Sequence, residues 1–284
     1  MPHNLSISEQ LAYNTVRIEC DLTSGGSGTG TGYFYRFELS NNIMVPVIVT
    51  NKHVIDDVKQ MRFILTLSNA NDEPMPQSHF GFYIDDVEKN WIKHTDSEID
   101  LCIMPIQPLL TQAAQINKKF FFISLEKSLI PTQQELDDMT ALEDIIMVGY
   151  PNGIWDKVNN LPILRKGITA SHPNFDWNGK PEFMIDAACF PGSSGSPVLL
   201  FNQGGYSTKS GGMIIGPSRI KLLGTLYAGP QHTIAGDVKI INVPTQQKPI
   251  AISTIPNNLG IVIKSKVLSD FLPILQNLVN QSGS

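Results

Sequence analysis

The chain has few cysteines, no cluster of basic residues and no long hydrophobic run. Only three of its 284 residues are cysteines, Cys20, Cys102 and Cys189, and their spacing matches no zinc-binding template. A sparse, odd-numbered set is more typical of a reducing compartment than of a disulfide-stabilised secreted domain. Lys and Arg (21) are outnumbered by Asp and Glu (26) and form no stripe that could neutralise phosphates. We therefore expect no nucleic-acid partner.

The first residues and the apolar segments indicate where the protein works. Residues 1–6 lack the basic region followed by an apolar one that marks a secretory signal. No apolar run approaches the roughly 20 residues that a helix needs to span a bilayer. The sequence therefore predicts a soluble, cytoplasmic protein without a membrane partner.

What is present is a series of short apolar segments rich in β-branched residues. Residues 15–20 and 32–37 alternate apolar and polar side chains, as half-buried strands do. The series continues at residues 45–50, 62–67, 101–105, 145–149, 183–187, 198–201, 222–226 and 261–263. Short strands separated by turn residues are typical of an all-β sandwich or barrel.

The carboxyl-terminal segment instead has helical periodicity. The apolar residues that recur at this spacing are Val267, Leu268, Phe271, Leu272, Leu275, Leu278 and Val279. Pro273 within them predicts a kink or a late start of the helix. Residues 112–138 are irregular, and we interpret them as a crossover between two β halves. The pattern as a whole favours two barrels and a terminal helix.

Residues 25–32 alternate glycine with Ser and Thr and invite comparison with a phosphate-binding loop. They lack the Gly-Lys-Ser/Thr of a P-loop and the glycine spacing of a dinucleotide-binding motif. We expect a flexible turn between two strands here.

Two segments each contain one candidate catalytic residue. His53 follows the apolar run 45–50, where a lone histidine is more often structural. Asp100 precedes the apolar run 101–105, and a buried carboxylate is costly unless it is hydrogen-bonded, so it needs a partner. Together with His94, Asp96 and Glu98, Asp100 could be interpreted as a metal site, but such a run is more often solvated. Neither segment alone indicates catalysis.

A third segment is more specific. Residues 186–197 read Asp-Ala-Ala-Cys-Phe-Pro-Gly-Ser-Ser-Gly-Ser-Pro and precede the apolar run 198–201. Gly192 and Gly195 flank Ser194, and glycines allow the tight turn that directs backbone N–H groups at one point. That is the geometry of an oxyanion hole. A Gly-Ser surface turn is the alternative, and the order His53, Asp100, Ser194 along the chain argues against it.

Together these segments resemble the catalytic motifs of chymotrypsin-fold serine proteases, most closely HtrA (Deg)-type and related bacterial trypsin-like peptidase domains. The resemblance covers about residues 14–272 and includes Thr50-Asn51-Lys52-His53-Val54-Ile55, Asp100-Leu101, residues 186–197, Gly26-Ser27-Gly28, residues 148–153 and residues 223–226. It implies a single peptidase domain over residues 1–284 with two six-stranded antiparallel β-barrels. We expect the first barrel at about residues 14–112, the crossover at 113–138, the second barrel at 139–264 and the terminal helix at 265–280.

The resemblance also implies a mechanism. His53 would act as general base, Asp100 would orient it, and Ser194 would be the nucleophile of an acyl-enzyme reaction. The backbone N–H groups of Gly192 and Ser194 would form the oxyanion hole. The expected activity is that of an intracellular serine endopeptidase with a restricted protein or peptide substrate and without metal or organic cofactor. A regulatory partner and a catalytically degenerate domain that only binds protein remain alternatives.

The substrate pocket is expected from the same resemblance. Ala188 would form its floor, and Tyr227, Ala228, Gly229 and Gly260 its walls, with Gly260 leaving one wall open. Since no charged residue occupies these positions, we expect an apolar side chain in the pocket. The long loops at residues 202–219 and 230–258 could alter this pocket.

Two departures from the family pattern concern regulation. Trypsin-like zymogens have an acid just before the nucleophile, where this chain has Ser193, so we expect no activation through a new amino terminus. Too few residues follow Ile263 for the PDZ domain of HtrA proteins.

Overall fold

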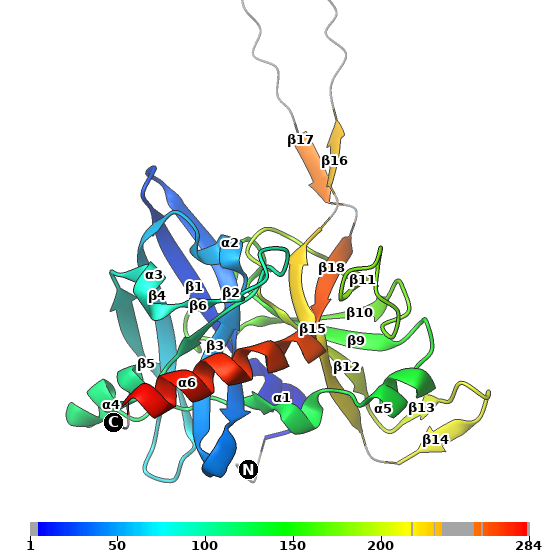
Figure 1. Cartoon of the computed structure of the whole chain (residues 1–284), viewed down its shortest axis with the longest axis horizontal. Coiled ribbons are helices and arrows are strands. Elements are labelled where there is room, and N and C mark those ends of the chain that lie inside the picture. Colours follow the sequence, from blue (N-terminus) through cyan, green and yellow to red (C-terminus); the bar gives the residue numbers. More distant parts are fainter. Residues whose placement is uncertain (1–4, 217, 230, 235–252, 257, 283–284) are drawn as a thin grey trace, which may run out of the picture.

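The computed structural model describes residues 5–216, 218–229, 231–234, 253–256 and 258–282. Two β halves lie side by side, and the carboxyl-terminal helix runs across both of them (Figure 1). Short helices precede or connect the strands: α1 (Ile7–Ala12), α2 (Lys52–Ile55), α3 (Val87–Asn90), α4 (Gln107–Gln115) and α5 (Gln133–Asp138). Among the described residues, no helix is both long and apolar enough to cross a membrane.

The first half is one sheet of eight strands. These are β1 (Thr15–Leu22), β2 (Ser27–Glu38), β3 (Met44–Thr50), β4 (Val58–Ser68), β5 (Pro74–Ile84), β6 (Ile92–Lys93), β7 (Cys102–Pro105) and β8 (Leu125–Glu126). The pairing order is β5-β4-β1-β2-β3-β7-β6, and β8 joins β2 in parallel. In the described residues this path does not close, so the six-stranded barrel expected here is not shown. The terminal strand β6 has only two residues, which leaves few backbone groups to complete a ring.

The second half contains a closed six-stranded barrel, as the sequence predicts. Its strands, in the order β10-β11-β18-β15-β12-β9, are β9 (Asp144–Gly149), β10 (Ile163–Thr169), β11 (Glu182–Asp186), β12 (Pro197–Asn202), β15 (Arg219–Ala228) and β18 (Leu259–Lys264). Inward side chains such as Met147, Phe183 and Val262 fill the barrel. Two hairpins project from it: β13 (Gly205–Ser207) with β14 (Met213–Ile215), and β16 (Gln231–Ile234) with β17 (Ser253–Pro256).

The crossover is more regular than expected. Between the halves the chain forms the end of α4, then β8, the 3₁₀ turn η2 (Lys127–Leu129) and α5. Thr132 and Glu135 cap α5 reciprocally: the Thr132 hydroxyl accepts from the Glu135 N–H, and the Glu135 carboxylate accepts from the Thr132 N–H. This capping box is a sequence signal for a helix start that the periodicity analysis missed.

The carboxyl-terminal helix ties the two halves together. A 3₁₀ segment, η4 (Ser265–Phe271), precedes α6 (Leu272–Ser282), so the α-helix starts late, as Pro273 predicted. Proline is tolerated in the first turn because the N–H it lacks would have no intrahelical acceptor. Phe271 and Leu275 are buried in a cluster with Tyr33 and Val47 of the first half and Leu222 of the second.

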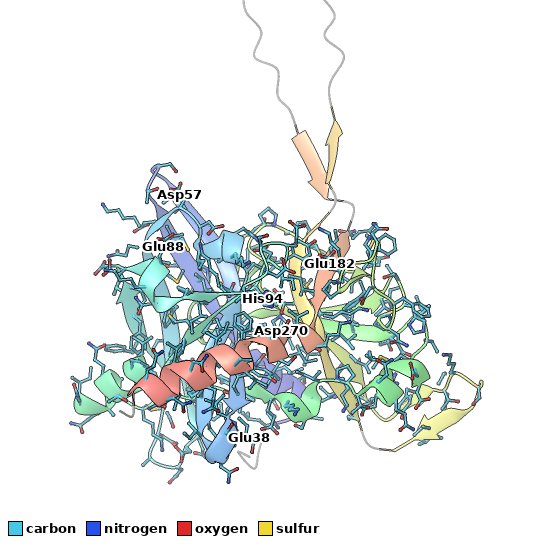
Figure 2. All side chains as sticks on the ribbon, viewed as in Figure 1. Glu38, Asp57, Glu88, His94, Glu182 and Asp270 are labelled. Carbon is cyan, nitrogen blue, oxygen red and sulfur yellow. The ribbon has the colours of Figure 1, made fainter. Side chains whose placement is uncertain are left out.

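A second contact joins this helical segment to the first half. His94 faces Asp270 (Figure 2), and its Nε2 atom lies 3.2 Å from Asp270 Oδ2. The His94 ring packs edge-on against Phe271. The His94 Nδ1 atom accepts from the Asp96 N–H. His94 is therefore a structural histidine, and the described residues contain no group of acids, histidines and cysteines that could hold a metal ion.

Candidate active site

His53 and Asp100 meet through two contacts. His53 lies in α2, directly after β3, and Asp100 lies just before β7, the neighbour of β3 in the sheet. Asp100 Oδ2 is 2.5 Å from His53 Nδ1, and Asp100 Oδ1 accepts from the His53 backbone N–H at 3.1 Å. Asn51 Nδ2 donates to the Asp100 carbonyl at 2.7 Å. With Nδ1–H donated to the carboxylate, Nε2 is left as the proton acceptor of the ring.

Ser194 stands on two successive tight turns. The Ser193 N–H donates to the Phe190 carbonyl at 3.0 Å, with Pro191 and Gly192 (φ +83°) between them, the signature of a type II turn. The Ser196 N–H donates to the Ser193 carbonyl, and Gly195 (φ +87°) stands in the corresponding position. Both glycines have the positive φ that other residues adopt only at a cost, so the local sequence dictates this loop.

The serine loop is held from the first half by Thr31. The Thr31 N–H donates to the Ser194 carbonyl at 2.9 Å, and the Thr31 hydroxyl donates to the Gly192 carbonyl at 2.9 Å. The Thr50 hydroxyl in turn donates to the Thr31 carbonyl at 2.7 Å. Thr31 and Thr50 are fully buried. These two threonines join the serine loop to the strand that leads to His53.

The position of Thr31 corrects the interpretation of the glycine-rich segment. A turn was expected over residues 25–32, but only its first residues turn, and residues 27–32 belong to β2. Gly32 packs against Ile48, since a Cβ at Gly32 would lie 2.6 Å from Ile48 Cγ2, and a Cβ at Gly30 would overlap Val54. The alternating glycines make room for side chains of β3 and α2. They do not form a flexible loop.

The backbone N–H groups of Gly192 and Ser194 have no acceptor within the described residues. Their neighbours are occupied, since the Ser193 N–H donates to Phe190 and the Gly195 N–H to Leu226. The Gly192 carbonyl is held by Thr31. The turn thus leaves two donors, one on each side of Ser193, for an oxygen of a ligand.

The Ser194 hydroxyl is turned toward the second half. It donates to the Tyr227 carbonyl at 3.5 Å, and within the described part of the chain no hydrogen bond joins it to His53. The structure therefore brings His53 and Asp100 together but leaves the bond from Ser194 to His53 unmade. Such bonds are often long or absent in ligand-free enzymes and form with substrate.

Cys189 occupies the space that was expected to stay open beside Gly260. A Cβ at Gly260 would lie 2.7 Å from Cys189 Sγ, and a Cβ at Gly229 would lie 3.7 Å from Cys189 Cβ. Burial raises the pKa of the Cys189 thiol to about 11, so it stays protonated at neutral pH. The predicted wall glycines thus face a small, weakly polar side chain that sequence reasoning missed.

Two other predicted pocket residues, Ala188 and Tyr227, form hydrogen bonds with strands of the second barrel. Ala188 is half-buried, and its carbonyl accepts from Arg165 Nη1. The Tyr227 hydroxyl donates to the buried Glu182 carboxylate at 2.9 Å, and burial together with this bond raises the pKa of the phenol. Ala228 ends β15. Of the long loop that follows, residues 230, 235–252 and 257 lie outside the described residues.

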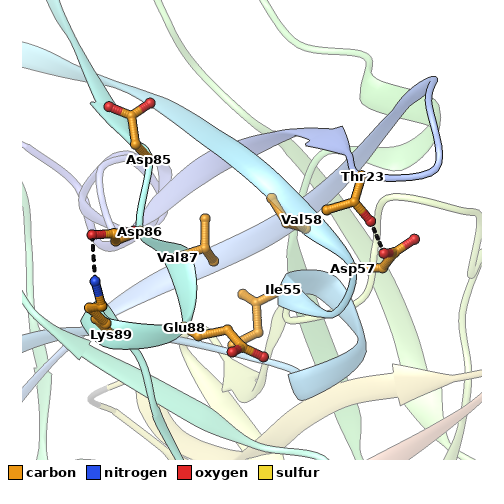
Figure 3. A pocket seen from close by; sticks show the side chains of 9 residues that line it. All are labelled: Thr23, Ile55, Asp57, Val58, Asp85, Asp86, Val87, Glu88 and Lys89. Atoms are coloured by element: carbon orange, nitrogen blue, oxygen red, sulfur yellow. Dashed lines mark hydrogen bonds and ion pairs between the residues drawn. The ribbon is translucent and has the colours of Figure 1, made fainter.

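A separate pocket lies beside α2 (Figure 3). It has a volume of about 420 Å³ and is lined by Thr23, Ile55, Asp57, Val58, Asp85, Asp86, Val87, Glu88 and Lys89. Lys89 pairs with Asp86 at 2.9 Å, and Thr23 donates to Asp57. None of the predicted site residues lines this pocket, so it is distinct from the candidate active site.

Comparison with known proteins then decides the family. A family model described as a trypsin-like peptidase domain matches residues 30–205, which is more than half of the chain and includes His53, Asp100 and Ser194. The chain belongs to the trypsin-like peptidase family. No curated protein sequence matches this family member.

Among solved structures, two forms of one protease resemble this trypsin-like peptidase. The active form of the Rv3671c protease from M. tuberculosis is 12% identical, with a TM-score of 0.42, over 91% of this chain and 79% of that chain. The inactive form of the Rv3671c protease is 14% identical, also with a TM-score of 0.42, over 93% of this chain and 90% of that chain.

Proposed function

We propose that this trypsin-like peptidase is a serine endopeptidase with His53, Asp100 and Ser194 as its catalytic triad. The observation that carries the proposal is the double contact of Asp100 with the ring and the backbone N–H of His53. A carboxylate that accepts hydrogen bonds from both the ring and the backbone N–H of a histidine fixes the tautomer and the orientation of the ring. The ring nitrogen Nε2 is then the base available to a serine hydroxyl.

In the proposed reaction, Ser194 first rotates its hydroxyl away from the Tyr227 carbonyl. Ser194 Oγ attacks the peptide carbonyl carbon while His53 Nε2 takes the hydroxyl proton, and Asp100 stabilises the imidazolium. The N–H groups of Gly192 and Ser194 bind the oxyanion. His53 returns the proton to the leaving amine, and an acyl-enzyme remains on Ser194. A water molecule, deprotonated by His53, then releases the acid.

The labelling experiment that tests this function uses an organophosphonate probe. We expect a covalent adduct on Ser194 in the full-length chain, and none in Ser194→Ala. An adduct on another residue, or equal labelling of both proteins, would refute the assignment. If Ser194 is not labelled either with or without added substrate peptides, the result would favour the alternative, a catalytically degenerate domain that only binds protein. The observation that favours this alternative is that the Ser194 hydroxyl bonds to the Tyr227 carbonyl and not to His53.

We infer an intracellular location and a restricted protein substrate for the enzyme. All three cysteines are free thiols, which fits a reducing compartment. Fractionation of cells, with peptide-level profiling of the cleaved proteins, tests both points. A secreted, oxidised protein or indiscriminate cleavage would contradict them.

Substrate preference follows from the environment of Cys189. We expect apolar residues of modest size just before the cleaved bond, with Lys and Arg least favoured. A basic side chain would lose hydration without meeting a carboxylate, and the Arg165 guanidinium bonded to the Ala188 carbonyl adds repulsion.

A peptide library measures this preference, and Cys189→Gly is the informative variant. Removing the thiol should widen the pocket and shift the preference toward larger apolar residues by about 10-fold or more, the range expected when one or two methylene-sized groups change. Leu164→Ala on the exposed face of β10 is the control. A native preference for basic residues, or no shift in Cys189→Gly, would contradict this pocket assignment.

A further inference from the structure

Arg165 reaches from the barrel wall to the nucleophile loop. It lies in β10, opposite Met147 of β9. Its Nη1 atom donates to the Ala188 carbonyl and, at 3.0 Å, to the Ser193 hydroxyl. One guanidinium thus contacts the loop at the predicted pocket floor and again at the residue before the nucleophile.

This position is costly for a cation. Burial is the main cause that lowers the pKa of Arg165, to about 10, so the group is still charged at neutral pH. Its hydrogen-bond partners are a carbonyl and a hydroxyl and not a carboxylate, and among the described residues its Nε and Nη2 atoms are buried without a hydrogen-bond partner. A buried charge without a counter-ion destabilises a fold unless its hydrogen bonds compensate. Its two bonds at this place go to the Ala188–Ser193 segment.

Ser193 connects Arg165 to the other end of the turn, at Phe190. Ser193 is almost completely buried, and its hydroxyl, while accepting from Arg165, also accepts from the Phe190 N–H at 3.4 Å. The Ser193 N–H donates back to the Phe190 carbonyl. Both ends of the type II turn are therefore joined through one side chain that Arg165 holds.

The type of this turn decides where an oxyanion donor is directed. Type I and type II turns differ by rotation of the central peptide, here the one between Pro191 and Gly192. Its N–H belongs to Gly192, one of the two donors without an acceptor. Its carbonyl is fixed by the Asn152 N–H at 2.6 Å. A loosened turn would let this peptide rotate and would direct the Gly192 N–H away from the substrate.

We propose that Arg165 is a positioning residue, which holds the Ala188 carbonyl and the Ser193 hydroxyl so that the oxyanion donors of Gly192 and Ser194 stay in place. It does so from within the chain, without a newly cleaved amino terminus. This inference rests on the proposed serine-peptidase function and assigns that site an internal cation as its organiser.

The test compares Arg165→Met, Arg165→Lys and the control Lys166→Met, which alters the next, exposed residue of β10. We expect Arg165→Met to lower kcat by about 10²–10³-fold, the cost of one lost oxyanion donor, while KM changes less than threefold. Affinity for a peptide aldehyde, whose adduct carries an oxyanion, should fall in parallel with kcat/KM. Arg165→Lys keeps the positive charge on a single donor nitrogen and should recover part of the loss. Lys166→Met should match the wild type.

A double-mutant cycle with Ser193→Ala covers the case in which Arg165→Met is unstable. Ser193→Ala should lower kcat in the wild type but have a much smaller effect when Arg165 is already replaced, because the two residues act through one contact. Additive losses would overturn the proposal. So would an unchanged kcat in folded Arg165→Met, or a loss confined to KM.

The amino terminus provides an independent readout. A full-length chain that bears an amino-terminal tag should have the same kcat as the untagged chain. The contacts of Arg165 with Ala188 and Ser193 do not involve the amino terminus. Activity that appears only after cleavage near β1 would overturn the proposal. If the wild type shows no Ser194-dependent hydrolysis or labelling at all, the serine-peptidase function itself fails. An active wild type with normal kcat in Arg165→Met removes only the role of Arg165.

Discussion

Replacing Ser194 or His53 by alanine should lower kcat/KM for a peptide substrate by about 10⁶-fold in each case, and the double variant should lose little more. The two residues act as one unit, since neither the nucleophile nor the base is effective alone. Asp100→Asn should cost about 10⁴-fold, because an amide in place of the carboxylate favours the wrong imidazole tautomer. Hydrolysis of a fluorogenic peptide pool, with thermal unfolding to confirm the fold, measures all three.

The second His–Asp pair of the molecule provides a matched control. Asp270→Asn removes the acid that lies 3.2 Å from His94 Nε2 and should leave hydrolysis unchanged, since neither residue adjoins the serine loop. Near-normal activity in His53→Ala would refute its role as base. Equal losses in Asp100→Asn and Asp270→Asn would mean that the first substitution acts through stability and not through the tautomer.

Gly195→Ala should destabilise the protein by about 2–5 kcal/mol and abolish labelling of Ser194. A left-handed backbone costs a non-glycine residue about 1–2 kcal/mol, and forcing an extra methyl into a packed site costs about 1–3 kcal/mol more. Gly195 has φ +87°, and a Cβ there would overlap the Thr31 carbonyl. Urea unfolding, with the midpoint and the m value both fitted, measures the change in free energy of unfolding.

Gly211→Ala separates the two contributions. Gly211 has nearly the same φ, +86°, but nothing lies within 4 Å of its Cβ position. Gly211→Ala should therefore lower the free energy of unfolding only by the backbone cost of about 1–2 kcal/mol. It should leave Ser194 reactive. If the two alanine variants are equally stable, the contact between Gly195 and β2 does not hold the serine loop as the geometry indicates.

The sequence by itself determined the features that depend on neighbouring residues. The turn from Phe190 to Ser193 closes through a bond between residues three apart, with proline and glycine at the two positions that a type II turn demands. Pro273 likewise marked the start of α6. The helix α5 within residues 112–138 was not predicted, because the capping box of Thr132 and Glu135 is a local signal that periodicity does not detect.

The residues of the proposed triad were predicted from motifs, but the meeting of His53 with Asp100 was predicted only from the resemblance. These residues are 47 positions apart, and no spacing rule joins them. In the fold they meet because β3 and β7 are neighbours in one sheet. The same pairing of strands, and not the composition, decided that the described first half forms an open path where a closed barrel was expected.

Only the tertiary structure identified Thr31, Cys189 and Arg165. Thr31 bonds to a carbonyl 161 residues away, and Arg165 bonds to Ser193, 28 residues further along the chain. Each of these residues looks ordinary in the sequence. Its role arises from burial, where the cost of an unpaired polar group makes every remaining hydrogen bond decisive. Which groups become buried together is settled by packing within and between the two halves. This is why local patterns located the proposed nucleophile but not the residues that hold its loop.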